Sequence, residues 1–160
     1  MCSSYYCNYY CTVRAAGICW ERQYIFRKCE CASYEDKTRV QIPGCEEPPC
    51  LLKRRTKSSV EQKFTPDHDI QSLVTEVNGI ILGVPVPFLG VDGTSACDNI
   101  FNADGTKGGC PLKKGVEYIY KNSFPILPVY PTIPVVVHYA LREGLNNRIT
   151  CFEVPSRITN

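Results

Sequence analysis

The chain has 160 residues, a formal net charge of +2 and 11 cysteines. That length suits one domain, and a domain of this size buries roughly 70% of its unfolded surface, so a substantial core is expected. The small net charge argues against bulk binding to nucleic acid. No run of about 18 apolar residues indicates a membrane-spanning helix.

The cysteines favour a disulfide framework formed in an oxidising compartment. A cytosolic domain rarely carries so many cysteines unless it binds metal, and their close pairs lack the spacing of zinc sites. The two histidines, His68 and His138, are far from these pairs in the sequence. We therefore expect a secreted or lysosomal protein with no metal and no cofactor.

Residues 1–25 are rich in cysteine and tyrosine and lack the apolar stretch of about 7–15 residues that a signal peptide requires. This segment contains Cys2, Cys7, Cys11 and Cys19. It is either an incorrectly assigned start that replaces a true signal peptide or a genuine cysteine-rich extension. We expect the domain itself over residues 26–160.

From about Tyr24 onward, apolar and polar residues alternate in short segments, which is the pattern of half-buried β-strands. The predicted strands include residues 38–42, 58–65, 73–82, 116–120, 133–141 and 149–158. Turn signals such as Pro43-Gly44 and Asp92-Gly93 separate them. About seven short strands with regular turns predict an all-β sandwich.

Two proline-containing segments are unusual for such a sandwich. In residues 83–88, Pro85 and Pro87 each lack an N–H, so this apolar segment is expected at a sheet edge. Just before it, Gly79 is a candidate bulge or kink. If this segment and residues 124–131 hold the sheets apart at one end, an apolar cavity results. The alternation alone does not decide between a cavity and a dry core.

A set of motifs then occurs in a characteristic order. They are Cys45-x4-Cys50, Gly79, Gly83-Val-Pro-Val-Pro-Phe88, Cys97…Cys110-Pro111, Tyr118-x-Tyr120, Pro125, Tyr130-Pro131, Val135-Val-Val137 and Cys151-Phe-Glu-Val-Pro155. Over residues 26–160 the chain resembles the Niemann–Pick type C-two proteins of the ML (MD-two-related lipid-recognition) domain family. That resemblance implies an immunoglobulin-like β-sandwich with a ligand cavity between its sheets.

The resemblance also implies three disulfides, which are Cys29–Cys151, Cys45–Cys50 and Cys97–Cys110. Six cysteines alone allow 15 pairings, so this choice rests on the resemblance. Cys31 is extra beside that framework.

The resemblance further implies where a lipid would bind. The mouth of the cavity would be formed by Phe88, Ile126, Tyr130 and Pro131. The interior would be lined by Leu52, Val60, Val77, Val135, Val137, Tyr139, Phe152 and Val154. The alternation independently puts Val135, Val137 and Tyr139 on one face of a strand.

The implied function is non-enzymatic binding and transport of sterols, fatty acids or related lipids by a monomer with transient membrane or receptor contacts. Two alternatives stay open: recognition of microbial lipids in innate immunity or signalling, and a ligand-free interaction module with a filled core. The sequence contains no Gly-x-Ser-x-Gly elbow and no His-Glu-x-x-His pair, so we expect no catalytic residues.

Three polar features have plain structural interpretations beside their functional ones. The basic run 53–57 could contact anionic headgroups, but a solvated turn is the simpler interpretation. Asp67-His68-Asp69 could bind metal, although a solvated loop is favoured. His138 is expected to face outward from its strand.

Overall fold

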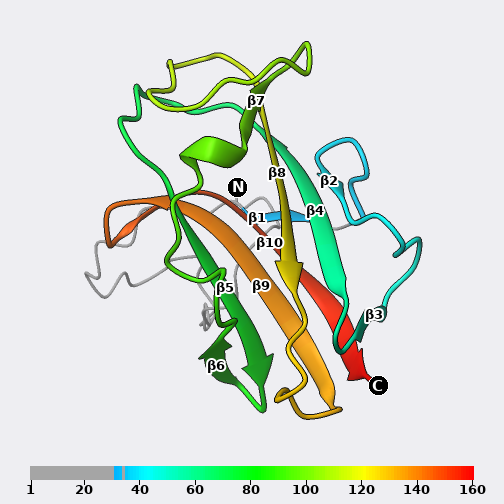
Figure 1. Cartoon of the computed structure of the whole chain (residues 1–160). Helices are drawn as coiled ribbons and strands as arrows, with labels where there is room; N and C mark the ends of the chain where they lie inside the picture. The colour runs from blue at the N-terminus through cyan, green and yellow to red at the C-terminus, as the bar shows by residue number, and fades with distance from the viewer. Residues whose placement is uncertain (1–30, 34) are drawn as a thin grey trace, which may run out of the picture.

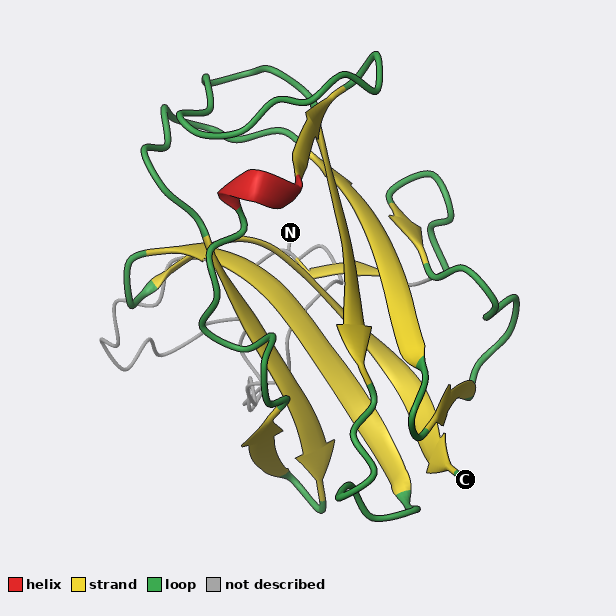
Figure 2. Ribbon diagram, viewed as in Figure 1, coloured by secondary structure: helices red, strands yellow, loops and turns green. Residues whose placement is uncertain are grey.

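The computed structural model describes residues 31–33 and 35–160. Residues 1–30, with the predicted segment boundary at 25/26 and Cys29, therefore lie outside the described residues. The described part forms two sheets packed face to face (Figure 1), with a single short 3-10 helix among its strands (Figure 2). The predicted all-β sandwich is confirmed.

Ten strands occur in the described residues. They are β1 (Cys31–Ser33), β2 (Val40–Gln41), β3 (Cys50–Lys53), β4 (Lys57–Phe64), β5 (Val74–Ile81), β6 (Val84–Pro87), β7 (Ile100–Asn102), β8 (Tyr118–Pro125), β9 (Pro134–Glu143) and β10 (Asn147–Thr159). The 3-10 helix η1 spans Cys97–Asn99.

The larger sheet has the order β1-β10-β9-β5-β6, and β3 also pairs with β10. Strands β1 and β3 both run parallel to β10, β1 beside Cys151–Glu153 and β3 beside Ser156–Thr159. The smaller sheet has the order β2-β4-β8-β7. Strands β4, β5, β9 and β10 match predicted strands, because each is long enough to show its alternation of buried and exposed residues.

The short strands account for the differences from the sequence prediction. Strand β8 begins at Tyr118 and continues to Pro125, while Val116 precedes it and is exposed. Strands β1, β3 and β7, with three or four residues each, were not predicted. Such short strands carry too little periodicity to be recognised, and their partners are remote in the sequence.

Strand β6 confirms the prediction of a proline-containing edge strand. It pairs only with β5, with Ile80 opposite Pro85 and Asn78 opposite Pro87. The two-residue turn Leu82-Gly83 joins the strands, and both residues have positive φ angles of 50° and 80°. Positive φ at both positions is the geometry of a tight hairpin turn.

Gly79 is neither a bulge nor a kink, so that prediction is wrong. It lies in regular register opposite Val137 of β9 and Val86 of β6. A Cβ atom at this position would lie 2.8 Å from Val135 Cγ2 and 3.2 Å from Phe88 Cε2. A side chain at position 79 would collide first with Val135 and then with the Phe88 ring, so the lack of a side chain suits this close packing.

Two of the three predicted disulfides are confirmed and one is corrected. Cys45 bonds Cys50, and Cys97 bonds Cys110. Cys151 bonds Cys31, so the pairing with Cys29 is wrong, and Cys31 is part of the framework. The physical reason is strand register: β1 lies parallel to β10 with Cys31 directly opposite Cys151, at a Cα–Cα distance of 4.4 Å.

The core between the sheets divides into an upper and a lower half, one at each end of the sandwich. The upper half, at the top of Figure 1, lies at the end near β7. It contains Phe64 at the end of β4, its partner Tyr118 at the start of β8, and Leu141 near the end of β9. The lower half lies at the end with the β5–β6 turn and the C-terminus. It contains Val60 of β4, Phe124 near the end of β8 and Val154 in the second half of β10.

Candidate functional site

A small pocket lies between the two sheets in the lower half. Its volume is about 20 Å³. Its lining side chains come from both sheets and are mostly apolar: Ile42, Cys50, Leu52, Ser58, Ser59, Val60, Phe124, Val137, Tyr139, Phe152, Val154 and Ser156. The alternation of β4, β9 and β10 produces this wall, because every second residue of each strand points toward the facing sheet.

Six of the eight residues predicted to line the interior meet at this pocket: Leu52, Val60, Val137, Tyr139, Phe152 and Val154. The other two, Val77 and Val135, are buried in the core but do not line it. The part of these residues in ligand binding stays a prediction.

The four residues predicted at the mouth do not line the pocket, although Phe88 contacts the lining residue Phe124. Phe88 and Ile126 are buried, Tyr130 is half-buried and Pro131 is exposed. The Phe88 ring packs edge-on against the rings of Phe124 and Tyr130, with distances between ring centroids of 5.8 and 5.4 Å. The backbone N–H of Leu89 donates to Tyr130 Oη at 2.8 Å. This aromatic cluster closes the lower end of the sandwich.

The basic turn between β3 and β4 is fastened to the same end. Arg54 Nη1 donates to the carbonyls of Pro128 at 3.1 Å and Tyr130 at 3.3 Å. The Arg55 N–H donates to the Ile126 carbonyl, and the Ile126 N–H donates to the Thr56 carbonyl. Arg54 thus holds the loop that carries Tyr130, while Lys53, Arg55 and Lys57 remain exposed.

The pocket is far smaller than a lipid. Sites for small organic ligands typically have volumes of about 300–1,000 Å³, whereas this pocket of about 20 Å³ holds roughly one water molecule. A sterol or fatty acid could enter only if the lower ends of the two sheets separate.

A set of polar side chains crosses the core next to the pocket, and we call it the polar belt (Gln62, Tyr120, Asn122, Tyr139 and Thr150). Asn122 is half-buried and the other four are buried. Tyr120 Oη and Tyr139 Oη are 2.7 Å apart and connect the two sheets. Asn122 Nδ2 donates to both hydroxyl oxygens, at 2.8 and 3.1 Å. Gln62 Nε2 donates to Thr150 Oγ1 at 2.7 Å, which is a second connection between the sheets.

The register of the strands brings these residues together. Gln62 is the direct partner of Tyr120 across β4 and β8. On the facing sheet, Tyr139 pairs with Phe152 and stacks on its ring, while Thr150 is the next inward position of β10. Tyr139 also lines the pocket, so the belt forms its upper wall.

Burial keeps the hydroxyls of the belt uncharged. It raises the pKa of Tyr139 far above its ordinary value, with a further contribution from the neighbouring Tyr120. Burial also raises the pKa of Tyr120, against the lowering effect of its hydrogen bonds with Tyr139 and Asn122. The belt therefore offers neutral hydrogen-bonding groups.

The sequence analysis did not identify the belt or several lining residues of the pocket. A signal was present, because Gln62 stands in the same phase as the apolar Val60 and Phe64, and Asn122 stands in phase with Tyr120. A polar residue in the apolar phase of a strand is expected to be buried and hydrogen-bonded. Phe124 has the same phase, but the prolines that follow it suggested a loop.

His68 is paired with Glu143, a partner that the sequence did not indicate. Its Nε2 lies 2.7 Å from Glu143 Oε2, and its Nδ1 contacts Asp67. The hydrogen bond with Glu143 and then that with Asp67 raise the pKa of His68, and the same histidine lowers the pKa of Glu143. Asp69 contacts Lys113 instead, at 3.2 Å. The segment is a surface ion-pair cluster that ties the loop before β5 to the end of β9.

His138 lies on the outer face of the larger sheet, but it is buried, so the expectation of an ordinary outward-facing histidine needs correction. Its Nδ1 lies 3.0 Å from Glu153 Oε1, and its Nε2 lies 3.7 Å from Glu76 Oε1. Hydrogen bonding to His138 lowers the pKa of Glu153. The buried ring therefore lies between carboxylates from the two neighbouring strands, Glu76 of β5 and Glu153 of β10.

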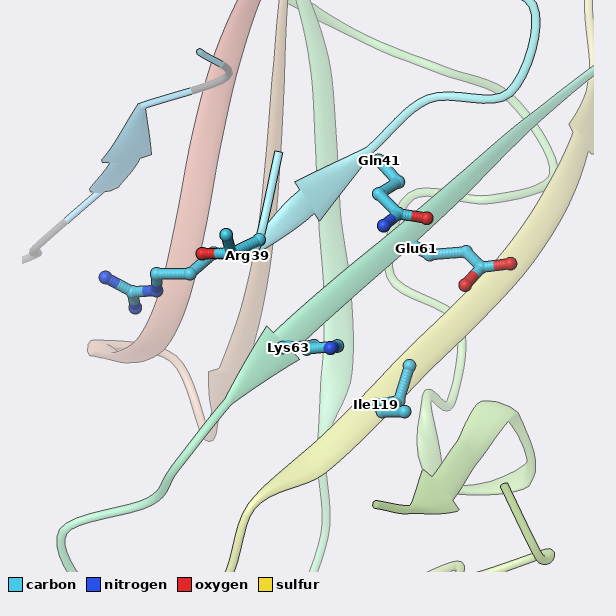
Figure 3. A pocket seen from close by; sticks show the side chains of 6 residues that line it. Arg39, Gln41, Glu61, Lys63 and Ile119 are labelled. Carbon is cyan, nitrogen blue, oxygen red and sulfur yellow. The ribbon is translucent and has the colours of Figure 1, made fainter. Parts of the chain in front are cut away.

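A second small pocket lies on the outer face of the smaller sheet (Figure 3). It is lined by Thr38, Arg39, Gln41, Glu61, Lys63 and Ile119, and its volume is also about 20 Å³. Glu61 is already paired with Lys121 at 3.2 Å. Its lining side chains are all charged or polar except Ile119, which does not suit an apolar ligand.

Among residues 31–33 and 35–160, no group of three or more His, Cys, Asp or Glu side chains is arranged to hold a metal ion. Nor does that part of the chain contain a helix long and apolar enough to cross a membrane.

The molecule is thus a disulfide-bonded β-sandwich with an apolar pocket between its sheets. A family model described as "ML domain" matches residues 23–158, and the chain belongs to this family. The predicted resemblance is confirmed.

Named relatives agree with this assignment. The chain is 36% identical over 121 residues to the "NPC intracellular cholesterol transporter 2" of Bos taurus, covering 74% of each chain. It is 33% identical over 132 residues to "NPC intracellular cholesterol transporter 2 homolog a" of Drosophila melanogaster, covering 81% of this chain and 84% of the relative. The crystal structure of a Niemann-Pick type C2 protein from the Japanese carpenter ant matches with a TM-score of 0.66 and 28% identity, over 85% of this chain and 100% of that one.

Proposed function

We propose that this protein binds and transports a small hydrophobic ligand, a sterol, fatty acid or related lipid, in the space between its sheets. The observation that carries the proposal is the apolar pocket inside a sandwich of the ML family. Relatives named as cholesterol transporters support it. Burial of the ligand's apolar surface would drive binding, at about 25 cal/mol per Å².

The lower ends of the sheets would separate to admit the ligand. Phe88, Ile126, Tyr130 and Pro131 would then form the mouth. The contacts of Phe88 with Phe124 and Tyr130 are ring contacts, which can be exchanged for contacts with a lipid at little cost in free energy. The residues that line the small pocket would become the walls of a larger one.

The protein would act without catalysis and as a monomer, in a secreted or lysosomal setting that preserves its disulfides. Contacts with a donor or acceptor membrane or receptor would be transient.

Two matched variants test this site. Val154→Phe places extra volume in the pocket, whereas Val40→Phe makes the same change at a buried position of the smaller sheet that does not line it. Both should lose about 1–3 kcal/mol of stability through overpacking. Only Val154→Phe should weaken binding of a fluorescent sterol or fatty acid in titrations. Equal affinity in both variants would contradict the proposed site.

The small volume of the pocket favours one alternative, a ligand-free interaction module with a nearly filled core. Native mass spectrometry of protein from its natural source separates the two functions. A lipid bound at one per chain supports the carrier, and a chain without lipid that also fails to bind added sterol or fatty acid supports the module.

A further inference from the structure

The polar belt contains hydrogen-bonding capacity that the described residues do not use. Gln62 is fully buried, and its Oε1 has no hydrogen-bond partner among the described residues. A buried carbonyl oxygen without a partner destabilises a folded protein unless another group satisfies it.

The tyrosine pair leaves an unused donor on the strand next to Gln62, where Tyr120 is the direct cross-strand partner of Gln62. One of the two hydroxyl hydrogens is shared between Tyr120 and Tyr139. Asn122 acts only as a donor toward both oxygens, and its own Oδ1 accepts from the Ser123 N–H at 2.8 Å. The second hydroxyl hydrogen therefore has no acceptor among the bonds of the belt.

One unused acceptor and one unused donor are together complementary to a hydroxyl group, which donates one hydrogen bond and accepts another. Tyr139 already forms part of the pocket wall, and Gln62 is the next inward residue of β4 after the lining residue Val60. An elongated ligand that enters from the lower end would bring its leading tip to this point.

The belt also restricts the charge of that tip. None of its five residues is ionised near neutral pH. The tyrosine hydroxyls are protonated there, burial raises their pKa further, and the other three side chains are amides and a hydroxyl. A carboxylate or phosphate buried here would lack a compensating charge, and its desolvation would oppose binding.

We propose that the polar belt is a specificity site for lipids whose leading, deeply inserted end carries a neutral hydroxyl group. This inference rests on the proposed function, because it requires the intersheet space to be the ligand site. It makes Gln62, Tyr139 and Tyr120 selectivity residues in addition to their role in connecting the sheets.

Two matched pairs of probes test the proposal: cholesterol with 25-hydroxycholesterol, and palmitic acid with 16-hydroxypalmitic acid. In each pair the second lipid adds one hydroxyl at the end remote from its headgroup. The wild-type protein should bind the hydroxylated member of at least one pair roughly tenfold more tightly, as expected for one buried polar pair that is satisfied rather than unpaired.

The variants Gln62→Leu and Tyr120→Phe remove the acceptor and one hydroxyl of the tyrosine pair while keeping similar volumes, and neither residue lines the pocket. Each should abolish that preference and leave the affinity for the parent lipid within about twofold, with circular dichroism and thermal unfolding to establish folding. Leu112→Ala, a buried position of the upper half that belongs to neither the belt nor the pocket lining, serves as the control and should retain the preference.

The outcomes separate this inference from the proposed function. If the parent lipids bind but the hydroxylated ones bind no better, or the preference persists in both belt variants, the belt only connects the sheets and the inference is overturned. If none of the four lipids binds to the wild-type protein, the proposed function itself fails, and the inference with it.

Discussion

The upper and lower halves of the sandwich share the same long strands but are closed in different ways. Above the polar belt, the loops themselves enter the core: Ile70 and Leu112 exchange backbone hydrogen bonds and are fully buried. The Cys97–Cys110 disulfide ties the loops of this end together. Below the belt, the sheets enclose a pocket and end in a proline-containing edge strand and a loop held by Arg54.

From this difference we expect the upper half to contribute most to stability and the lower half to bind the ligand. The upper half is fixed by a disulfide, by loop pairing and by apolar packing that includes the Phe64 and Tyr118 rings. It can therefore keep the sheets together if the lower half opens as proposed. The polar belt marks the boundary, since it connects the sheets by hydrogen bonds at the upper wall of the pocket.

The largest effect on the free energy of unfolding is expected from the loss of the Cys31–Cys151 disulfide, which joins strands β1 and β10. In the chain-entropy model, closing a loop with a sequence separation of 120 residues contributes about 4–5 kcal/mol. Cys31→Ala should therefore lower the free energy of unfolding in urea by about that amount. Wild-type stability in this variant would mean that another cysteine replaces Cys31.

Proteolytic digestion without reduction can establish which cysteine is bonded to Cys151. Cleavage after Glu30 by a glutamate-specific protease separates Cys29 from Cys31. Mass spectrometry without reduction should find the Cys151 peptide joined to the fragment that begins at Cys31. Recovery of a Cys29–Cys151 link would refute the register described for β1 and β10.

A pair of identical substitutions compares the two halves. Leu112 is fully buried in the upper half, and Leu52 lines the pocket in the lower half. Leu112→Ala should cost about 2–5 kcal/mol, the usual range for a buried leucine, without changing lipid affinity. Leu52→Ala should cost less, because it enlarges an existing space, and it should change the affinity for lipid. Chemical denaturation and ligand titration measure both; equal effects of the two variants on affinity would remove the distinction between the halves.

The smallest effect concerns the ion pair between His68 and Glu143 at the upper end. The folded-state pKa of His68 is raised above 6.5, so its contribution to stability is fully present below pH 6.5 and is lost as the pH rises through that raised pKa. The pKa of Glu143 is lowered from 4.5, so its contribution is present above pH 4.5 and is lost as the pH falls through the lowered pKa.

The pair should therefore stabilise the fold most between pH 4.5 and 6.5. Both side chains are partly exposed, so the contribution should stay below about 1 kcal/mol. The difference in melting temperature between wild type and His68→Gln should be larger near about pH 5.5 than near about pH 9. A difference that does not vary with pH would exclude this pairing as its cause.

The local pattern of the sequence was sufficient for the long strands and for the edge strand. Period-2 alternation identified β4, β9 and β10, because each is long and has one buried face, and a long apolar run identified β5. Pro85 and Pro87 predicted an edge position, because a residue without an N–H cannot complete a central ladder. The order of motifs identified the ML family before any contact was known.

Tertiary structure decided the features that depend on which strands become neighbours. The parallel register of β1 and β10 selected Cys31 over Cys29, which is only two residues away in the sequence. Gly79 looked like a bulge, but its lack of a side chain serves the Phe88 ring, nine positions further along the chain. Gln62 was a polar residue in an apolar phase, and only the packing of the sheets brought it to Thr150 and placed the belt above the pocket. Alternation determines which face a residue occupies, whereas strand register and sheet packing determine what it meets there.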